Sequence, residues 1–245
     1  MTHRITDEPA YLLHSWVYGE TSEIGEFFTR NHGKLPAIMR GRRGSKRNSR
    51  LLQGRLYKIA LVGSGEILQL TSAEMQDASQ LDATGGKLLS VLYVCELLHA
   101  LLLRSDAAAQ LFDAFASWQN QLHSPNHVLG LRRFELLLLV SLGYGLDVSA
   151  DCHGEAICAD VRYWVNPNQG LFRCISANEP GITGAALIEL NDPLSSCTDA
   201  SILNSLRQLT RYLLEFRLAG KTIRSWQLGA SLSALKSQLS HEPIA

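Results

Sequence analysis

The pattern of hydrophobic and polar positions changes its period near residue 80 of this 245-residue chain. Before that point, short runs of β-branched and aromatic residues alternate with glycine and asparagine turn signals, a pattern typical of strands. Asn31-His32-Gly33-Lys34 and Gly63-Ser64-Gly65 each have the composition of a hairpin turn. The five strands expected from this pattern cover residues 11–17, 24–29, 35–40, 56–62 and 66–71.

Five short strands with one long connection suit a small closed barrel, and the OB-fold is the five-stranded barrel most often used to hold single-stranded nucleic acid. An SH3-like barrel would fit the pattern nearly as well. We expect an OB-fold barrel over residues 1–80. Four aromatic residues near its long connection could offer stacking surfaces, although most of them are expected in the core. They are Trp16, Phe27, Phe28 and Tyr57.

After Gly85-Gly86 the apolar residues recur at helical spacing. The run over residues 87–104 resembles a membrane span, but Glu96 and His99 interrupt it and it is too short, so a buried helix is expected. Further helices should each show one apolar face. These are a helix with Leu111, Phe115, Trp118 and Leu122, a helix over 128–142 ended by Gly143-Tyr144-Gly145, and a helix from Asp199 with Ile202, Leu206, Leu209, Leu213 and Phe216.

Residues 149–195 form an insert that breaks the helical pattern. Two β-forming runs, 161–165 and 170–175, flank Asn166-Pro167-Asn168-Gln169, which predicts a β-hairpin. The rest of the chain after the barrel is therefore expected to be one α-helical domain in two parts, residues 81–148 and 196–245.

Basic residues are concentrated in one segment of the predicted barrel. Residues 30–58, the basic segment, contain ten Lys or Arg and no Asp or Glu, whereas the whole chain has a net charge of zero. The other 216 residues therefore carry a net charge of −10. A local positive field of this density is complementary to a polyphosphate and indicates nucleic acid.

Two alternatives to nucleic acid are a solvated loop without a partner and a surface for anionic lipid. Residues 40–50 hold no apolar side chain that could insert below lipid headgroups, which argues against the lipid. The residues expected to contact DNA phosphates are Lys34, Arg40, Arg42, Arg43, Lys46, Arg47, Arg50 and Arg55.

Catalytic motifs are missing from the sequence. It contains no glycine-rich phosphate loop followed by Lys and Ser or Thr, no HExxH and no nucleophile elbow. Its acidic pairs, such as Glu20 with Glu23, are scattered, whereas a metal-dependent nuclease needs clustered carboxylates. We expect a protein that is not an enzyme and has no cofactor.

The cysteines raise the question of zinc. A zinc ribbon presents its ligands from tight Cys-x-x-Cys turns, but five residues separate Cys152 from Cys158, and twenty-two separate Cys174 from Cys197. Free thiols are therefore expected and no metal. An odd number of cysteines, together with a polar N-terminus without a leader peptide, predicts a cytoplasmic protein.

Several short motifs occur along the chain in a specific order and spacing. They are Tyr11-Leu12-Leu13-His14-Ser15, Glu20-Thr21-Ser22, Phe28-Thr29-Arg30-Asn31-His32-Gly33, Arg40-Gly41, Leu131-Arg132-Arg133-Phe134-Glu135-Leu136, Leu142-Gly143-Tyr144-Gly145, Gly220-Lys221 and Ile223-Arg224-Ser225. Each is weak alone, but together they resemble the bacterial RecO family of recombination mediators.

The resemblance implies an α+β multidomain protein, with an N-terminal OB-fold barrel followed by an α-helical domain that carries a zinc-ribbon-like β insert, here expected without metal. It implies a nucleoid-associated protein that binds single- and double-stranded DNA, anneals complementary strands and hydrolyses no nucleotide. With RecR, it would help to load RecA onto DNA coated by single-stranded-DNA-binding protein. Because a basic barrel alone does not distinguish DNA from RNA, an RNA-binding or regulatory protein is the alternative.

A second site is expected in the helical domain. The tail of single-stranded-DNA-binding protein is acidic and ends in an apolar residue with a free carboxylate, so its receptor needs a cation beside an apolar pocket. Arg132 and Arg133, which precede Phe134 and the apolar residues 136–139, are the candidate contacts. The alternative is that both arginines are solvated or form salt bridges.

Overall fold

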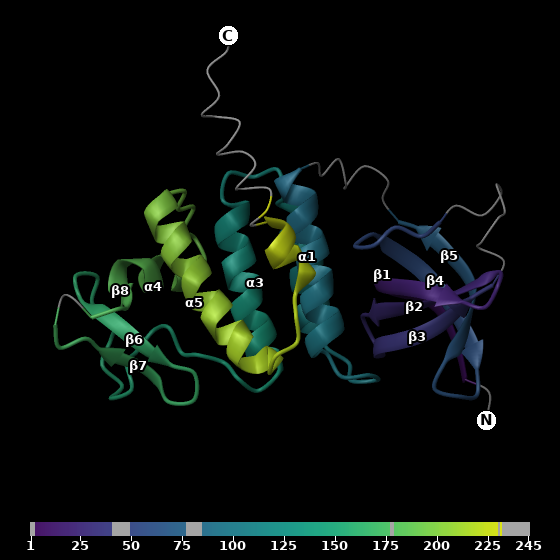
Figure 1. Ribbon diagram of the computed structural model, residues 1–245, viewed down its shortest axis with the longest axis horizontal. Helices are drawn as coiled ribbons and strands as arrows, with labels where there is room; N and C mark the ends of the chain where they lie inside the picture. Colours follow the sequence, from purple (N-terminus) through teal and green to yellow (C-terminus); the bar gives the residue numbers. More distant parts are fainter. Residues whose placement is uncertain (1–2, 41–49, 77–84, 177–178, 230, 232–245) are drawn as a thin grey trace, which may run out of the picture. The chain divides into compact units, whose positions relative to one another are not determined.

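The first part of the chain folds into a closed barrel of five strands. The computed structural model describes residues 3–40, 50–76, 85–176, 179–229 and 231. The barrel strands are β1 (His3–Tyr18), β2 (Ser22–Thr29), β3 (Gly33–Met39), β4 (Leu56–Gly63) and β5 (Leu68–Met75). They are hydrogen-bonded in the order β1-β2-β3-β5-β4, and β1 pairs with β4 to close the barrel (Figure 1). All pairs are antiparallel except β3 with β5, a closure that confirms the OB-fold.

The five strands lie where the sequence predicts them, and β1 differs most from its predicted bounds. It begins at His3 instead of residue 11. Acidic residues are depleted in strands, so Asp7 and Glu8 concealed this extension. They lie at an irregularity, because the register between β1 and β4 shifts between Ile5 and Glu8 and Asp7 has a φ of 56°.

The described part of the chain divides into two compact units, which we call unit 1 (residues 1–112 and 221–245) and unit 2 (residues 113–220). The helices are α1 (Gly86–Leu101), α2 (Ala109–Asn120), α3 (His127–Ser141), α4 (Gly184–Asn191) and α5 (Ala200–Leu218). Helix α1 buries Val91, Val94 and Leu98, which confirms the buried helix predicted there. Among the helices of the described ranges, none combines the length and apolar character needed to cross a membrane.

Alternation along the strands separates the barrel core from its outer face. Leu35, Ala37 and Met39 of β3 point into the core, so Lys34, Pro36 and Ile38 lie on the outer face. Of the four aromatic residues considered for stacking, three are at most 1% exposed, and only Trp16 is partly exposed, at 38%. The buried ones are Phe27, Phe28 and Tyr57.

The helices of unit 2 begin and end where the sequence signals them. Asp199 caps the N-terminus of α5 by accepting hydrogen bonds from the backbone N–H groups of Ser201 and Ile202 at 2.9 and 3.0 Å. Gly143, with a φ of 80°, ends α3 as predicted. One predicted core residue of α5 is wrong, because Phe216 is 48% exposed and Leu214 and Leu218 are buried in its place.

The insert contains the predicted hairpin and one helix that the sequence did not reveal. Strands β6 (Arg162–Asn166) and β7 (Gly170–Arg173) pair around the predicted turn, and the short strand β8 (Ile182–Thr183) joins the other edge of β6. Helix α4 follows directly. Its eight residues include few polar ones, so no helical period was visible in the sequence.

Candidate nucleic-acid interface

Arg40 and Arg50 stand near the ends of the basic connection, residues 40–55, which joins β3 to β4. Both are exposed, and 77% of the Arg50 side chain is accessible. Nε of Arg50 lies 4.0 Å from Oε1 of Glu23 on β2, so the returning chain passes close to this strand. The other predicted DNA contacts of the connection lie outside the described residues, except Arg55. They are Arg42, Arg43, Lys46 and Arg47.

The strand register brings the β1–β2 turn to the same end of the barrel. Glu23 pairs with Val17 on β1 and with Met39 on β3. The turn after β1 and the start of the basic connection therefore lie just beyond one row of paired residues. With Arg50 beside Glu23, the described ends of the connection and this turn gather at one end of the barrel.

Two further residues that were predicted to contact DNA, Arg55 and Lys34, are less exposed than Arg40 and Arg50. Arg55 is half-buried and already has an interaction partner within the protein. Lys34 is only 7% exposed. Its ammonium group is enclosed in unit 1, which corrects the prediction that Lys34 contacts DNA.

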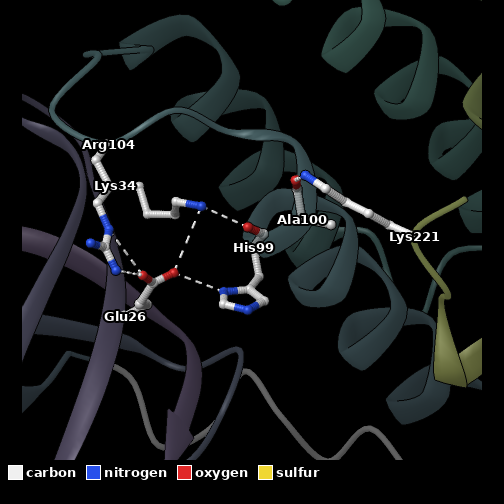
Figure 2. A network of polar contacts seen from close by, with 6 residues as sticks. All are labelled: Glu26, Lys34, His99, Ala100, Arg104 and Lys221. Carbon is white, nitrogen blue, oxygen red and sulfur yellow. Dashed lines mark hydrogen bonds and ion pairs between the residues drawn. The ribbon is translucent and has the colours of Figure 1, made fainter. Parts of the chain in front are cut away.

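Lys34 belongs to a network of ionic contacts around Glu26 (Figure 2). Oε1 of Glu26 accepts hydrogen bonds from Nη2 and Nε of Arg104 at 2.6 and 3.2 Å. Oε2 of Glu26 lies 2.8 Å from Nδ1 of His99 and 3.7 Å from Nζ of Lys34. The network thus joins the outer face of β2 and β3 to α1 and the segment that follows it.

Glu26 is held in its charged form by these partners. Burial alone raises the pKa of this carboxyl, but hydrogen bonds from His99 and Arg104 and the charge of Lys34 outweigh burial and lower the pKa to about 2. Burial lowers the pKa of Lys34, despite its contact with Glu26. The charge of Glu26 is therefore tolerable at low exposure because His99, Arg104 and Lys34 surround it, and the charge of Lys34 because Glu26 lies beside it.

The same network satisfies the C-terminal end of α1. Nζ of Lys34 donates to the carbonyl oxygen of His99 at 2.6 Å, and Nζ of Lys221 donates to that of Ala100 at 2.8 Å (Figure 2). The last carbonyl groups of a helix have no partner within the helix and carry a partial negative charge, which cations stabilise. Lys34 therefore has a structural role that explains its burial.

Gly33 allows the chain after α1 to approach β3 closely. Its φ is 69°, and a Cβ atom placed there would lie 2.2 Å from the carbonyl oxygen of Asp106. Next to this approach, the N–H of Ser105 donates to the carbonyl oxygen of Lys34 at 3.1 Å. Only glycine fits both the conformation and the space.

The two arginines predicted to hold a protein partner have internal roles in unit 2. Arg132 is 7% exposed, and its Nη1 lies 2.9 Å from Oε2 of Glu135 and donates to Oγ1 of Thr210 at 3.2 Å. The burial of Arg132 corrects its assignment as a surface contact. A signal was present in the sequence, because Glu135 follows at the i+3 position that favours an ion pair.

Arg133 closes the C-terminal end of α4. Its guanidinium group donates to the carbonyl oxygens of Glu189 and Leu190 at 3.0 and 3.1 Å, and also to that of Asp192. It is half-buried and lines a cleft of about 490 Å³ with Trp118, Phe134 and others. The sequence did not identify this cleft, because its walls come from different helices.

The cysteines of the insert do not assemble into a ligand set among the described residues. Cys152, Cys158 and Cys174 of the insert, and Cys197 just after it, are all free thiols there. A search of the residues that the structure describes finds no group of three or more His, Cys, Asp or Glu side chains that could hold a metal ion. The turn after Cys152 is instead organised by Asp151, whose carboxylate accepts hydrogen bonds from Arg173 and from the backbone of His153 and Glu155.

Comparison with known proteins agrees with this architecture over most of the chain. A family model described as "Recombination protein O N terminal" matches residues 1–78, and one described as "Recombination protein O C terminal" matches residues 83–227. A protein of Variovorax paradoxus (strain S110) named DNA repair protein RecO is 34% identical, over 95% of this chain and 98% of its own. The protein of that name from Xanthomonas euvesicatoria pv. vesicatoria (strain 85-10) is 31% identical, over 91% and 96%.

The barrel and the helices that follow define an OB-fold protein with a helical second part. The chain belongs to the RecO family of recombination and DNA repair proteins.

The network around Glu26 predicts a specific loss of stability in acid. Because its pKa in the folded state is lowered from 4.5 to about 2, the stability that Glu26 contributes is complete above about pH 4.5 and is lost as the pH falls toward 2. Glu26→Gln should reduce the free energy of unfolding near neutral pH by about 2–4 kcal/mol and should weaken the pH dependence in that window. Urea unfolding at several pH values measures both. Glu74→Gln, at an exposed carboxylate of β5, is the control and should change neither; equal behaviour of the two variants would contradict this role.

Proposed function

We propose that this protein is a non-enzymatic recombination mediator that binds single- and double-stranded DNA through the basic connection at the end of its barrel and anneals complementary strands. Together with RecR, it helps to load RecA onto DNA coated by single-stranded-DNA-binding protein in the bacterial cytoplasm. The observation that carries the proposal is the segregation of charge, ten cations without an acid in residues 30–58 of a neutral chain.

The position of these cations supports binding to a polyanion. The connection leaves the barrel through Arg40 and returns through Arg50, and both are exposed. Lys34 is buried and already has partners within the protein. Six cations in residues 40–50 remain to contact phosphates. They are Arg40, Arg42, Arg43, Lys46, Arg47 and Arg50.

Annealing follows from neutralisation of charge. Two complementary strands repel each other through their phosphates, and a cationic partner that contacts both lowers this repulsion. Contacts to phosphates carry no sequence information, which suits a protein that acts on any broken DNA. Membership of a family of DNA repair proteins favours DNA over the RNA alternative.

The receptor for the acidic tail of single-stranded-DNA-binding protein is proposed at the cleft of unit 2. Trp118, Phe134 and Leu137 lie in its lining among polar residues such as Gln121 and Ser124, and Arg133 supplies a positive charge at its side. The hydrogen bonds that Arg133 makes there go to carbonyl oxygens, and the carboxylates of Asp192 and Glu189 act on its charge from nearby. Of the two arginines predicted to contact the tail, Arg132 and Arg133, the proposal keeps Arg133 and leaves out the buried Arg132.

Reversing three charges of the connection should weaken DNA binding and annealing together. If the six cations contact phosphates, the slope of log K against log salt on single strands is about −4, from about −0.7 for each contact. The variant Arg42→Glu, Arg43→Glu, Arg47→Glu should lose at least about half of this slope, and its annealing rate should fall with its affinity. Fluorescence anisotropy over a salt series and a strand-annealing assay measure the two.

A pair of single variants serves as the control for charge. Arg40→Glu and Arg207→Glu each reverse one exposed arginine, the first at the connection and the second on α5. Only Arg40→Glu should reduce the slope. The proposal is wrong if the triple variant binds DNA as the parent does at moderate salt, or if RNA of the same sequence displaces the DNA with higher affinity.

An acidic side chain placed in the cleft should repel the acidic tail. Gln121 is exposed and lines the cleft, whereas its neighbour Asn120 is exposed and does not. Gln121→Glu should weaken binding of the tail peptide by about two- to fivefold, and Asn120→Glu should leave it unchanged. Calorimetry with the peptide measures this difference. Equal effects of the two variants would place the receptor elsewhere.

A further inference from the structure

The outer face of β1 and β2 is covered over one half and exposed over the other. In the covered half, the rings of Tyr11 and Phe28 pack against Phe112 at centroid distances of 5.0 and 5.4 Å, and Glu26 lies within its ionic network. In the other half, toward the β1–β2 turn, two aromatic side chains of β1 are accessible. Trp16 is 38% exposed and Tyr18 is 53% exposed.

The register places these rings on the same face as the start of the basic connection. Trp16 pairs with Ile24 of β2, and Ile24 pairs with Ile38 of β3. Directly paired residues share a face, and two strand spacings amount to about 10 Å. Arg40 follows two residues after Ile38, directly after the end of β3. A nucleotide whose base rests on Trp16 therefore has its phosphate within reach of the first cation of the connection.

The ring of Trp16 is held in place by neighbouring side chains. It is stacked with His14 at a centroid distance of 6.0 Å and an interplanar angle of 26°, and His14 lies 5.1 Å from His99 of α1. These contacts link Trp16 to the part of unit 1 that the network around Glu26 holds in place. A ring that is already positioned loses little conformational entropy when a base stacks on it.

The other tryptophans have different environments. Trp118 is 4% exposed, and Trp226 packs against Tyr93 at 6.1 Å. Trp164 is 40% exposed, nearly the same as Trp16, but it is stacked on Phe172 at 4.3 Å in the insert of unit 2. Trp16 is thus the tryptophan whose exposure coincides with the start of the basic connection.

We propose that Trp16, with Tyr18 beside it, is a stacking site for a nucleobase of single-stranded DNA whose backbone passes near Arg40, at the start of the basic connection. The proposal rests on the DNA-binding function proposed above. Bases of a single strand offer free faces, whereas those of a duplex are stacked on one another. The cations supply affinity for both forms, and Trp16 adds affinity for the single strand. Because every base has an aromatic face, this preference does not depend on sequence.

Binding of three DNA probes of equal length tests the site. They are a single-stranded thymine oligonucleotide, a strand with the same phosphates but abasic sugars, and a duplex. Stacking on one base predicts that Trp16→Leu weakens binding of the thymine strand by about 5- to 100-fold. Binding of the abasic strand and of the duplex should change less than about twofold, because neither presents a free base face. Trp16→Phe, which keeps an aromatic face, should retain most of the affinity.

The control is Trp164→Leu, which removes a tryptophan of nearly equal exposure from unit 2 and should leave all three affinities unchanged. The inference is overturned if Trp16→Leu binds the thymine strand as the parent does, or if it weakens the abasic strand equally. Failure of the DNA-binding function gives a different result in the same assay, because then the parent protein binds none of the probes.

Discussion

The antiparallel register of β1, β2 and β3 is the constraint on which the interface depends. Glu23 faces both Val17 and Met39, so the β1–β2 turn and the start of the basic connection must lie at one end of the barrel. A shift by one residue would turn Trp16 and Arg40 to the opposite face. The core residues of β3 prevent that shift, because Leu35, Ala37 and Met39 would then leave the interior.

Some cations of this protein bind internal partners, and others are exposed to solvent. Lys34 and Lys221 bind carbonyl oxygens at the end of α1, and Arg133 does the same at the end of α4. Arg132 is buried against Glu135. By contrast, Arg40 and Arg50 are exposed where the chain leaves and re-enters the barrel. Lys34 belongs to the basic segment but is buried, so a ligand meets less positive charge there than the ten cations of the sequence indicate.

The sequence predicted what depends on local patterns. Alternation placed the five strands, and Asp199 and Gly143 marked helix ends, because capping involves residues a few positions apart. The fate of each cation was not local. Lys34 meets His99 at a separation of 65 residues, so its burial could not be read from neighbouring positions. Arg132 meets Thr210 at a separation of 78, and only its pairing with Glu135 had a local signal.

DNA is proposed to lie at the end of the barrel where Trp16 and the described ends of the basic connection come together. Photochemical crosslinking of a thymine oligonucleotide to the full-length chain, with the crosslinked peptides mapped by mass spectrometry, tests it most directly. Crosslinks should fall in peptides from residues 11–58, which include the turn after β1 and the connection. Crosslinks confined to residues 113–220, with none in the barrel, would show that the DNA is held elsewhere.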